Sequence, residues 1–254
     1  MARVAVISAV HEELAEILQL MPDERKVTVA GREFWQGHLQ GHEVVAVLSG
    51  IGKVAAATTA TVLHERFAPQ YILFTGVAGG LALGAEVGDV VVGTRYLQHD
   101  LSAAPLFPRW EVPGSGKMHF DADLVLAQVL EEAARDAVTW LPKLVSEETL
   151  RALGLHRPTV HRGLIISGDR FITSAAESQA LREALPEALP EALAVDMESA
   201  AVAQVCWDYG TPFGAVRTLS DRADDEAHVD FQAFMRDVAR HYSARIVRKA
   251  LNLL

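Results

Sequence analysis

The chain has 254 residues, of which 50% are hydrophobic and 22% charged, so it can form a substantial core and is too apolar to be disordered. Its 33 acidic and 23 basic residues give a formal net charge of −10, which argues against a nucleic-acid partner because phosphate backbones are also anionic. The single cysteine, Cys206, excludes an internal disulfide, and no apolar run reaches the roughly 20 residues of a membrane helix. These features predict a soluble, cytoplasmic protein with no membrane partner.

Short β-branched runs, typical of buried strands, alternate with longer stretches that carry apolar residues at helical spacing. The first apolar run leads into His11-Glu12-Glu13 and not into a small-residue cleavage site, so we interpret it as a buried strand and not a signal peptide. Strands are predicted at 4–8, 26–30, 32–38, 43–48, 71–75, 88–92, 160–167, 192–195 and 213–220. Helices are predicted at 12–20, 53–67, 121–137, 175–185, 197–207 and 230–253.

The order of these elements predicts the fold class. Glycines divide residues 26–48 into an antiparallel meander, whereas helices separate most of the other strands. We therefore expect a single α/β domain over residues 1–254, a three-layer α/β/α sandwich around a twisted, mixed β-sheet. Residues 98–117 are rich in proline and glycine and predict a long functional or interfacial loop. The Glu-Ala-Leu-Pro repeat at 183–193 predicts a surface insertion without a chemical role.

Two glycine-rich segments, 50–52 and 76–80, follow consecutive predicted strands. The first lies in a G-x-G-x-x-A pattern between a strand and a helix, as in dinucleotide-binding proteins. That pattern also needs an acidic residue at the end of the next strand, where this chain has Thr75-Gly76. We therefore interpret both segments as turns at strand ends, where glycine lets the backbone approach a ligand.

Three acidic residues follow predicted strands: Glu13, Glu198 and Asp221. Each alone fits a helix cap or a first-turn acid, since helix N-termini favour negative charge. Together at one sheet edge they supply the acid and the base that glycosidic cleavage needs. His99-Asp100, at the start of the long loop, could assist. The sequence has no H-E-x-x-H and no G-x-S-x-G, so neither a metal site nor an acyl-transfer serine is predicted.

Seven stretches carry a resemblance to a known family. They are 5–13 (AVISAVHEE), 49–55 (SGIGKVA), 75–81 (TGVAGGL), 87–91 (VGDVV), 163–169 (GLIISGD) with Phe171-Ile172, 195–198 (VDME) and 216–221 (VRTLSD). Together they resemble the 5′-methylthioadenosine/S-adenosylhomocysteine nucleosidases of the nucleoside phosphorylase superfamily. The resemblance implies hydrolysis of the N-ribosidic bond, in methionine and S-adenosylmethionine salvage, without cofactor or metal. It also implies a homodimer in which the 98–117 loop reaches the partner's site.

The resemblance assigns roles to individual residues. Glu13 would activate water for attack at C1′, and Asp221, oriented by Ser220, would protonate adenine N7. Glu198 would hold the ribose hydroxyls. The remaining substrate contacts would come from Met197 on the sugar face, Phe171 stacked on adenine, the backbone of Ile172 at the base edge, Ile51 and Phe231 at the 5′-alkylthio group, and Val77 and Ala78.

These residue types suit the chemistry. N-ribosidic cleavage passes through an oxocarbenium-like state, so carboxylates near the sugar stabilise the developing positive charge. Asp221 needs a raised pKa to hold a proton near neutral pH, and an apolar shell would supply the desolvation. Val77 stands where some relatives carry serine, so a hydroxyl contact is lost there.

Three alternative functions are also compatible with the sequence. A purine nucleoside phosphorylase would use phosphate in place of water, but it needs arginines near the glycine segments, where Arg217 is the one clear candidate. A hydrolase of another 5′-modified nucleoside, such as aminofutalosine, would share the same residues. A non-catalytic nucleoside-binding protein would not need the water-activating Glu13.

Overall fold

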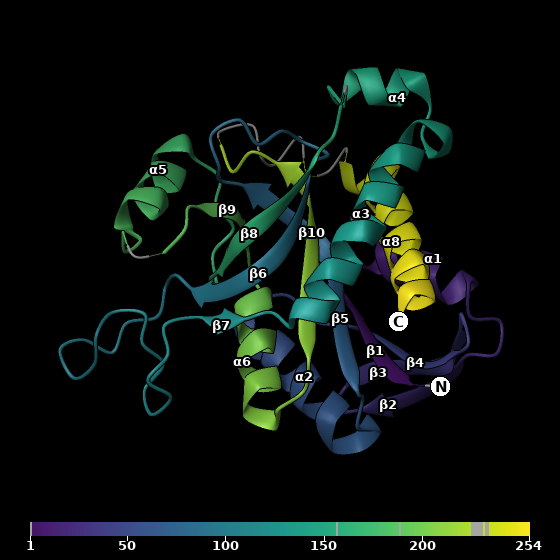
Figure 1. Cartoon of the computed structure of the whole chain (residues 1–254), viewed down its shortest axis with the longest axis horizontal. Helices are drawn as coiled ribbons and strands as arrows, with labels where there is room; N and C mark the ends of the chain where they lie inside the picture. Colours follow the sequence, from purple (N-terminus) through teal and green to yellow (C-terminus); the bar gives the residue numbers. More distant parts are fainter. Residues whose placement is uncertain (1, 156, 188, 225–230, 232–233) are drawn as a thin grey trace.

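The computed structural model describes residues 2–155, 157–187, 189–224, 231 and 234–254, in which strands and helices alternate along the chain (Figure 1). The strands are β1 Arg3–Ser8, β2 Arg25–Val29, β3 Arg32–Leu39, β4 His42–Leu48, β5 Tyr71–Gly80, β6 Val90–Gln98, β7 Phe120–Asp121, β8 Val160–Ser167, β9 Ala192–Asp196 and β10 Phe213–Asp221. The helices are α1 His11–Gln19, α2 Lys53–Phe67, α3 Leu124–Leu144, α4 Glu147–Ala152, α5 Ala175–Ala184, α6 Ser199–Tyr209 and α8 Arg240–Leu253, with a π-helical segment at Met235–Ala239.

The sheet is mixed, as the sequence predicts. β1 pairs in parallel with both β4 and β5, and β4, β3 and β2 form the expected antiparallel meander. On its other side β5 pairs in parallel with β10. The predicted bounds of the first strand, of the helix at 53–67 and of the strand at 160–167 agree closely with the structure, because each has a clear apolar pattern between turn signals.

Half of this sheet closes on itself, which the sequence does not predict. β10 pairs with β6, β6 with β8, β8 with β9, and β9 returns to β5 through antiparallel pairs of Gly79 with Val195 and of Gly80 with Ala194. Five strands therefore form a closed ring, and the meander extends from β5 as an open arm.

The predicted glycine turn at 76–80 is wrong, because β5 continues through these residues to Gly80. Gly76 lies opposite Arg217 and Gly79 opposite Asp221 in the pairing with β10. A Cβ at Gly76 would lie 3.2 Å from Nη1 of Arg217, and one at Gly79 would lie 2.9 Å from Oδ1 of Asp221. These glycines therefore make room for charged side chains of the neighbouring strand.

Several helix bounds also differ from the prediction. The helix expected at 121–137 begins at Leu124, where Asp123 accepts a hydrogen bond from the Leu126 N–H at 2.9 Å, and it continues to Leu144. The helix expected at 197–207 is α6, so Met197 and Glu198 precede it. The start of the helix expected at 230–253 lies outside the described residues. In the 183–193 repeat, Leu185 and Leu189 pack against a cluster of buried residues, so this segment is not purely a surface insertion.

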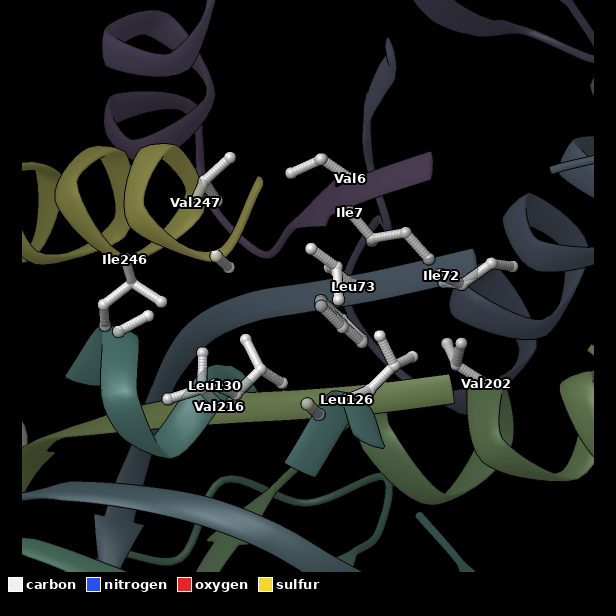
Figure 2. Packing of buried hydrophobic residues seen from close by; sticks show 14 of the residues in the cluster. Val6, Ile7, Ile72, Leu73, Leu126, Leu130, Val202, Val216, Ile246 and Val247 are labelled. Carbon is white, nitrogen blue, oxygen red and sulfur yellow. The ribbon is translucent and has the colours of Figure 1, made fainter. Parts of the chain in front are cut away.

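Helices cover both faces of the sheet, which confirms the three-layer α/β/α class. α2 and α6 pack together on one face, and α1, α3 and α8 pack on the other (Figure 1). Figure 2 shows the core between these layers, where α3 and α8 meet the central strands. Its labelled side chains are Val6, Ile7, Ile72, Leu73, Leu126, Leu130, Val202, Val216, Ile246 and Val247. No helix in the described part of the chain is long and apolar enough to cross a membrane.

Candidate active site

A pocket of about 430 Å³ opens where β5, β9 and β10 end, which is within the usual size range of small-molecule sites. Its lining residues are Ala9, Val10, Ile51, Val77, Ala78, Gly79, Arg170, Phe171, Ile172, Val195, Asp196, Met197, Glu198, Ser220, Asp221 and Phe231. They come from the ends of these three strands, from the segments that follow β1, β4, β8 and β9, and from Phe231. The closed ring of strands thus brings together residues that lie far apart in the sequence.

The residues predicted to contact substrate all line this pocket, and so does Asp221. Glu13 is not a lining residue but lies directly behind Ala9, whose N–H donates to its Oε2 at 3.3 Å. The sequence prediction missed Ala9, Val10, Gly79, Arg170, Val195 and Asp196 as lining residues. Each of them lies within four positions of a predicted site residue in the sequence, which is the signal that could have found them.

Glu13 occupies the first turn of α1 and is 1% exposed. Its Oε1 accepts a hydrogen bond from the Ser243 hydroxyl on α8 at 2.6 Å. Burial raises the pKa of Glu13, while the Ser243 hydrogen bond and the positive charge of Arg217 oppose that rise. Glu13 is therefore a buried carboxyl with an elevated pKa, as expected of a general base.

Glu198 lies between β9 and α6 and is 6% exposed. Its Oε1 accepts the N–H of Gly52, in the turn before α2, at 3.0 Å. Gly52 has a φ of +90°, which favours glycine and aims this N–H at the carboxylate. Burial and the neighbouring charge of Asp196 raise the pKa of Glu198 to about 7, against the opposing effect of Arg217.

A buried ion pair lies next to these carboxylates. Nε of Arg217 is 2.8 Å from Oδ2 of Asp196, and both side chains are at most 1% exposed. Asp196 also accepts hydrogen bonds from the hydroxyls of Ser167 and Ser199. Nη2 of Arg217 has no hydrogen-bond partner among the described residues. Arg217, the arginine that the sequence offers for a phosphate site, is thus paired with Asp196.

Asp221 is the last residue of β10 and is 1% exposed. The Ser220 hydroxyl donates to its Oδ2 at 2.8 Å, and the Ala223 N–H donates to its Oδ1 at 2.9 Å. The predicted pairing of Ser220 with Asp221 is therefore present, and the carboxyl group has a defined orientation at the pocket wall.

Apolar side chains form the outer wall of the pocket. Phe171 and Phe231 meet edge to face, with ring centroids 5.6 Å apart and an interplanar angle of 69°. Phe171 is 42% exposed and Ile51 is 75% exposed, so these side chains stand at the rim. Such a wall suits a flat aromatic base and an apolar substituent.

Lys53, Asp100 and Asp169 form a charged clamp beside the pocket. Nζ of Lys53 is 2.5 Å from Oδ1 of Asp100, and the Asp169 N–H donates to Oδ2 of Asp100 at 2.9 Å. The Lys53 N–H in turn donates to Oδ1 of Asp169 at 2.7 Å. Burial alone would raise the pKa of Asp100, but Lys53 and the Asp169 N–H hold it below its usual value. The clamp joins the start of α2 to the segment that carries Phe171.

The described residues contain no group of three or more His, Cys, Asp or Glu side chains that could hold a metal ion.

A model of the phosphorylase superfamily matches residues 3–252 of this sequence. The chain belongs to the phosphorylase superfamily. A 5′-methylthioadenosine/S-adenosylhomocysteine nucleosidase of Oceanobacillus iheyensis is 36% identical to it over 245 residues, which cover 96% of each chain. A relative with the same description from Bacillus anthracis is 36% identical over 247 residues, or 97% of each chain. This similarity assigns the chain to that nucleosidase family within the superfamily.

Solved structures agree with this assignment. A 5′-methylthioadenosine/S-adenosylhomocysteine nucleosidase of Neisseria meningitidis, in complex with methylthio-immucillin-A, is 33% identical over all of both chains, with a TM-score of 0.85. A futalosine hydrolase of Helicobacter pylori is 28% identical over 100% of this chain and 98% of its own, with a TM-score of 0.84. Relatives that are named for different substrates therefore share this fold.

Proposed function

We propose that this chain hydrolyses the N-ribosidic bond of 5′-methylthioadenosine and S-adenosylhomocysteine, releasing adenine and the 5′-thioribose sugar. The observation that carries the proposal is the arrangement of Glu13, Glu198 and Asp221 around one apolar pocket. The family membership and the 36% identity to nucleosidases over nearly the whole chain support it.

In this proposal the carboxyl groups act on opposite sides of the bond that breaks. Asp221 donates a proton to N7 of adenine, so the base leaves as a neutral molecule while the bond between C1′ and N9 breaks. Glu198 binds the ribose hydroxyls, and its charge stabilises the oxocarbenium-like sugar. Glu13 accepts a proton from the water that attacks C1′. Exchange with solvent then returns Glu13 and Asp221 to their starting protonation states.

Water is favoured over phosphate as the nucleophile. The two arginines beside the pocket are both paired, Arg217 with Asp196 and Arg170 with Glu177. A phosphate dianion would also meet the buried carboxyl of Glu13. Neither feature suits an anion site, whereas Glu13 suits the activation of water.

The test is product analysis of purified protein with 5′-methylthioadenosine or S-adenosylhomocysteine, with and without phosphate. Adenine and free sugar, formed at a rate independent of phosphate, are expected. A sugar 1-phosphate formed only with phosphate would establish the phosphorylase alternative. Release of base from futalosine or aminofutalosine, with none from the two thionucleosides, would establish the other hydrolase.

The clamp allows a prediction for substrate binding. Asp100→Asn keeps the shape of the side chain but removes the charge that binds Lys53, so the segment of Phe171 is held less firmly. We expect KM for 5′-methylthioadenosine to rise about tenfold with a smaller change in kcat, since a charge-assisted hydrogen bond contributes roughly 1.5 kcal/mol. Steady-state kinetics measures both constants. Asp136→Asn, which removes a comparable contact to Arg245 at 2.6 Å on another part of the surface, should leave them unchanged.

We also propose a homodimer in which the 98–117 loop lies near the partner's pocket. Figure 1 shows the loop between β6 and β7 extending away from the sheet. Leu106 in this loop is 83% exposed, and Val54 and Ile51 at the start of α2 are 78% and 75% exposed. The contact between Lys53 and Asp100 ties the start of the loop to the start of α2. Exposed apolar residues on adjoining segments are typical of an interface.

Leu106→Asp should therefore shift the protein from twice the chain mass to the mass of one chain in light scattering coupled to size-exclusion chromatography, because a charge would be buried in the interface. Leu83→Asp, at an equally exposed leucine outside these segments, should leave the dimer intact. Wild-type protein with the mass of one chain would contradict the proposed assembly.

We propose that residues 1–254 form one domain, which acts in the cytoplasm without a cofactor. One large hydrophobic cluster that includes Val4 of β1 and Leu251 of α8 supports the single domain. The lone cysteine, Cys206, is buried and suits a reducing compartment.

A further inference from the structure

The hydroxyl groups of Thr75 and Ser243 form a chain of hydrogen bonds that ends at Glu13. Thr75 is on β5, Ser243 is on α8 and Glu13 is on α1, so three elements meet at this point. Figure 1 shows α1 and α8 together on the same side of the sheet. The exposed fractions are 3% for Thr75, 1% for Ser243 and 1% for Glu13. At this burial, bulk water does not compete with the hydrogen bonds among them.

An ionised carboxylate can only accept hydrogen bonds, and this determines the direction of both hydrogen bonds. Oγ1 of Thr75 donates to Oγ of Ser243 at 2.9 Å, and Oγ of Ser243 donates to Oε1 of Glu13 at 2.6 Å. A serine hydroxyl has one hydrogen and can accept through its lone pairs. Because Ser243 accepts from Thr75, its own hydrogen is free to point at Glu13.

Both oxygens of Glu13 therefore accept hydrogen bonds, Oε1 from Ser243 and Oε2 from the Ala9 N–H at 3.3 Å. Donors such as these bind an ionised carboxylate more strongly than a neutral carboxyl group. The arrangement consequently favours the ionised carboxylate, which is the form that can accept a proton.

Charged groups are found on three of the elements near Glu13, namely α1, α8 and β10. On α1, Glu12 is exposed and Glu16 is 3.7 Å from Arg240 of α8. On β10, Arg217 stabilises the ionised form of Glu13 and is shared with Asp196. Burial acts in the opposite direction and is the largest single effect on the pKa of Glu13. Among the uncharged groups, the Ser243 hydroxyl has the largest effect in lowering the pKa of Glu13, and Thr75 donates a hydrogen bond to that hydroxyl.

We propose that Ser243 and Thr75 form a hydroxyl relay that positions the carboxylate of Glu13 and maintains it as a proton acceptor. Ser243 is a positioning residue in this scheme, because it is not among the residues that line the pocket. The inference rests on the proposed function, in which Glu13 accepts the proton of the attacking water.

Ser243→Ala removes the donor to Oε1, so the pKa of Glu13 should rise and the acidic limb of the kcat/KM profile should move to higher pH. One charge-assisted hydrogen bond corresponds to a shift of about one pH unit. At pH values below the limb, kcat/KM should therefore fall about tenfold. KM for 5′-methylthioadenosine well above the limb should stay unchanged, because no pocket residue is altered.

The control is Tyr242→Phe. Tyr242 is the neighbour of Ser243 on α8, is 1% exposed, and donates its hydroxyl hydrogen to the Gly88 carbonyl at 3.0 Å. This variant also loses one buried hydrogen bond on the same helix but does not touch Glu13, so the position of the acidic limb should not change. A second pair, Thr75→Val and Thr75→Ser, tests the relay if Ser243→Ala does not fold. The valine variant should shift the limb in the same direction, and the serine variant should restore it.

A direct titration separates this inference from the proposed function. The carboxyl carbon of Glu13, labelled with ¹³C and identified by its loss in Glu13→Gln, reports the pKa without any substrate. Wild-type protein that releases no adenine would overturn the proposed function, while a higher Glu13 pKa in Ser243→Ala would still support the relay. An active wild-type protein, with the same Glu13 titration and the same acidic limb in Ser243→Ala and Thr75→Val, would overturn the relay alone.

Discussion

Replacing Glu13 by Gln is expected to lower kcat for 5′-methylthioadenosine by about a thousandfold, within the range of 10²–10⁴ that general acid–base groups contribute. The amide cannot accept the proton of the attacking water, but it is close in size and can still accept a hydrogen bond from Ser243. KM should change little, because Glu13 lies behind the pocket wall. Steady-state adenine release at saturating substrate measures this effect.

The same variant should be at least as stable as the wild type near neutral pH. A carboxyl group whose pKa is raised in the folded state binds more protons in the folded than in the unfolded chain. It therefore destabilises the fold as the pH rises above 4.5, the ordinary pKa of glutamate. Gln removes this destabilisation, so thermal unfolding should show an equal or higher Tm at neutral pH. The difference in Tm should disappear below pH 4.5. Full activity in the Gln variant would contradict the role of Glu13 as base.

The sequence predicts local structure well wherever a strong apolar pattern lies between turn signals. The strand at 160–167 and the helix at 53–67 have the predicted bounds. It fails at Gly76–Gly80, where glycine normally indicates a turn but here allows a strand to pass Arg217 and Asp221. The closure of β5, β10, β6, β8 and β9 into a ring is equally hidden, because it depends on pairings between distant segments.

The residues of the candidate site likewise divide into those that the sequence predicts and those that it does not. Acidic residues such as Glu198 and Asp221 can be predicted from the sequence because they follow strands and lie in recognisable motifs. The residues that hydrogen-bond to the site cannot be predicted in this way, because they are distant in the sequence. Ser243 is 230 positions from Glu13, and Asp169 is 116 positions from Lys53. A serine in an amphipathic helix has no local pattern that distinguishes a buried donor from a residue at the helix surface.

Asp221→Asn should lower kcat for 5′-methylthioadenosine by about 10²–10⁴, because adenine is a poor leaving group unless N7 is protonated and the amide has no acidic proton to give. The buried position at the end of β10, with hydrogen bonds from Ser220 and Ala223, gives the side chain a defined orientation at the pocket wall. Asn keeps this shape, so a loss of rate reports the missing proton and not a collapsed pocket. Adenine release at saturating substrate, together with an unchanged Tm, measures it.

A substrate whose leaving group departs without protonation, such as the nitrophenyl glycoside of 5-methylthioribose, shows whether Asp221 donates a proton or only binds adenine. Nitrophenolate is stable as an anion, so Asp221→Asn should retain most of the wild-type rate with this substrate, whereas Glu13→Gln should still lose most of it, since water must be activated in both reactions. Equal losses with both substrates in Asp221→Asn would mean that Asp221 holds the pocket in shape and does not donate the proton. The two variants thus separate departure of the base from attack by water, the two halves of the proposed reaction.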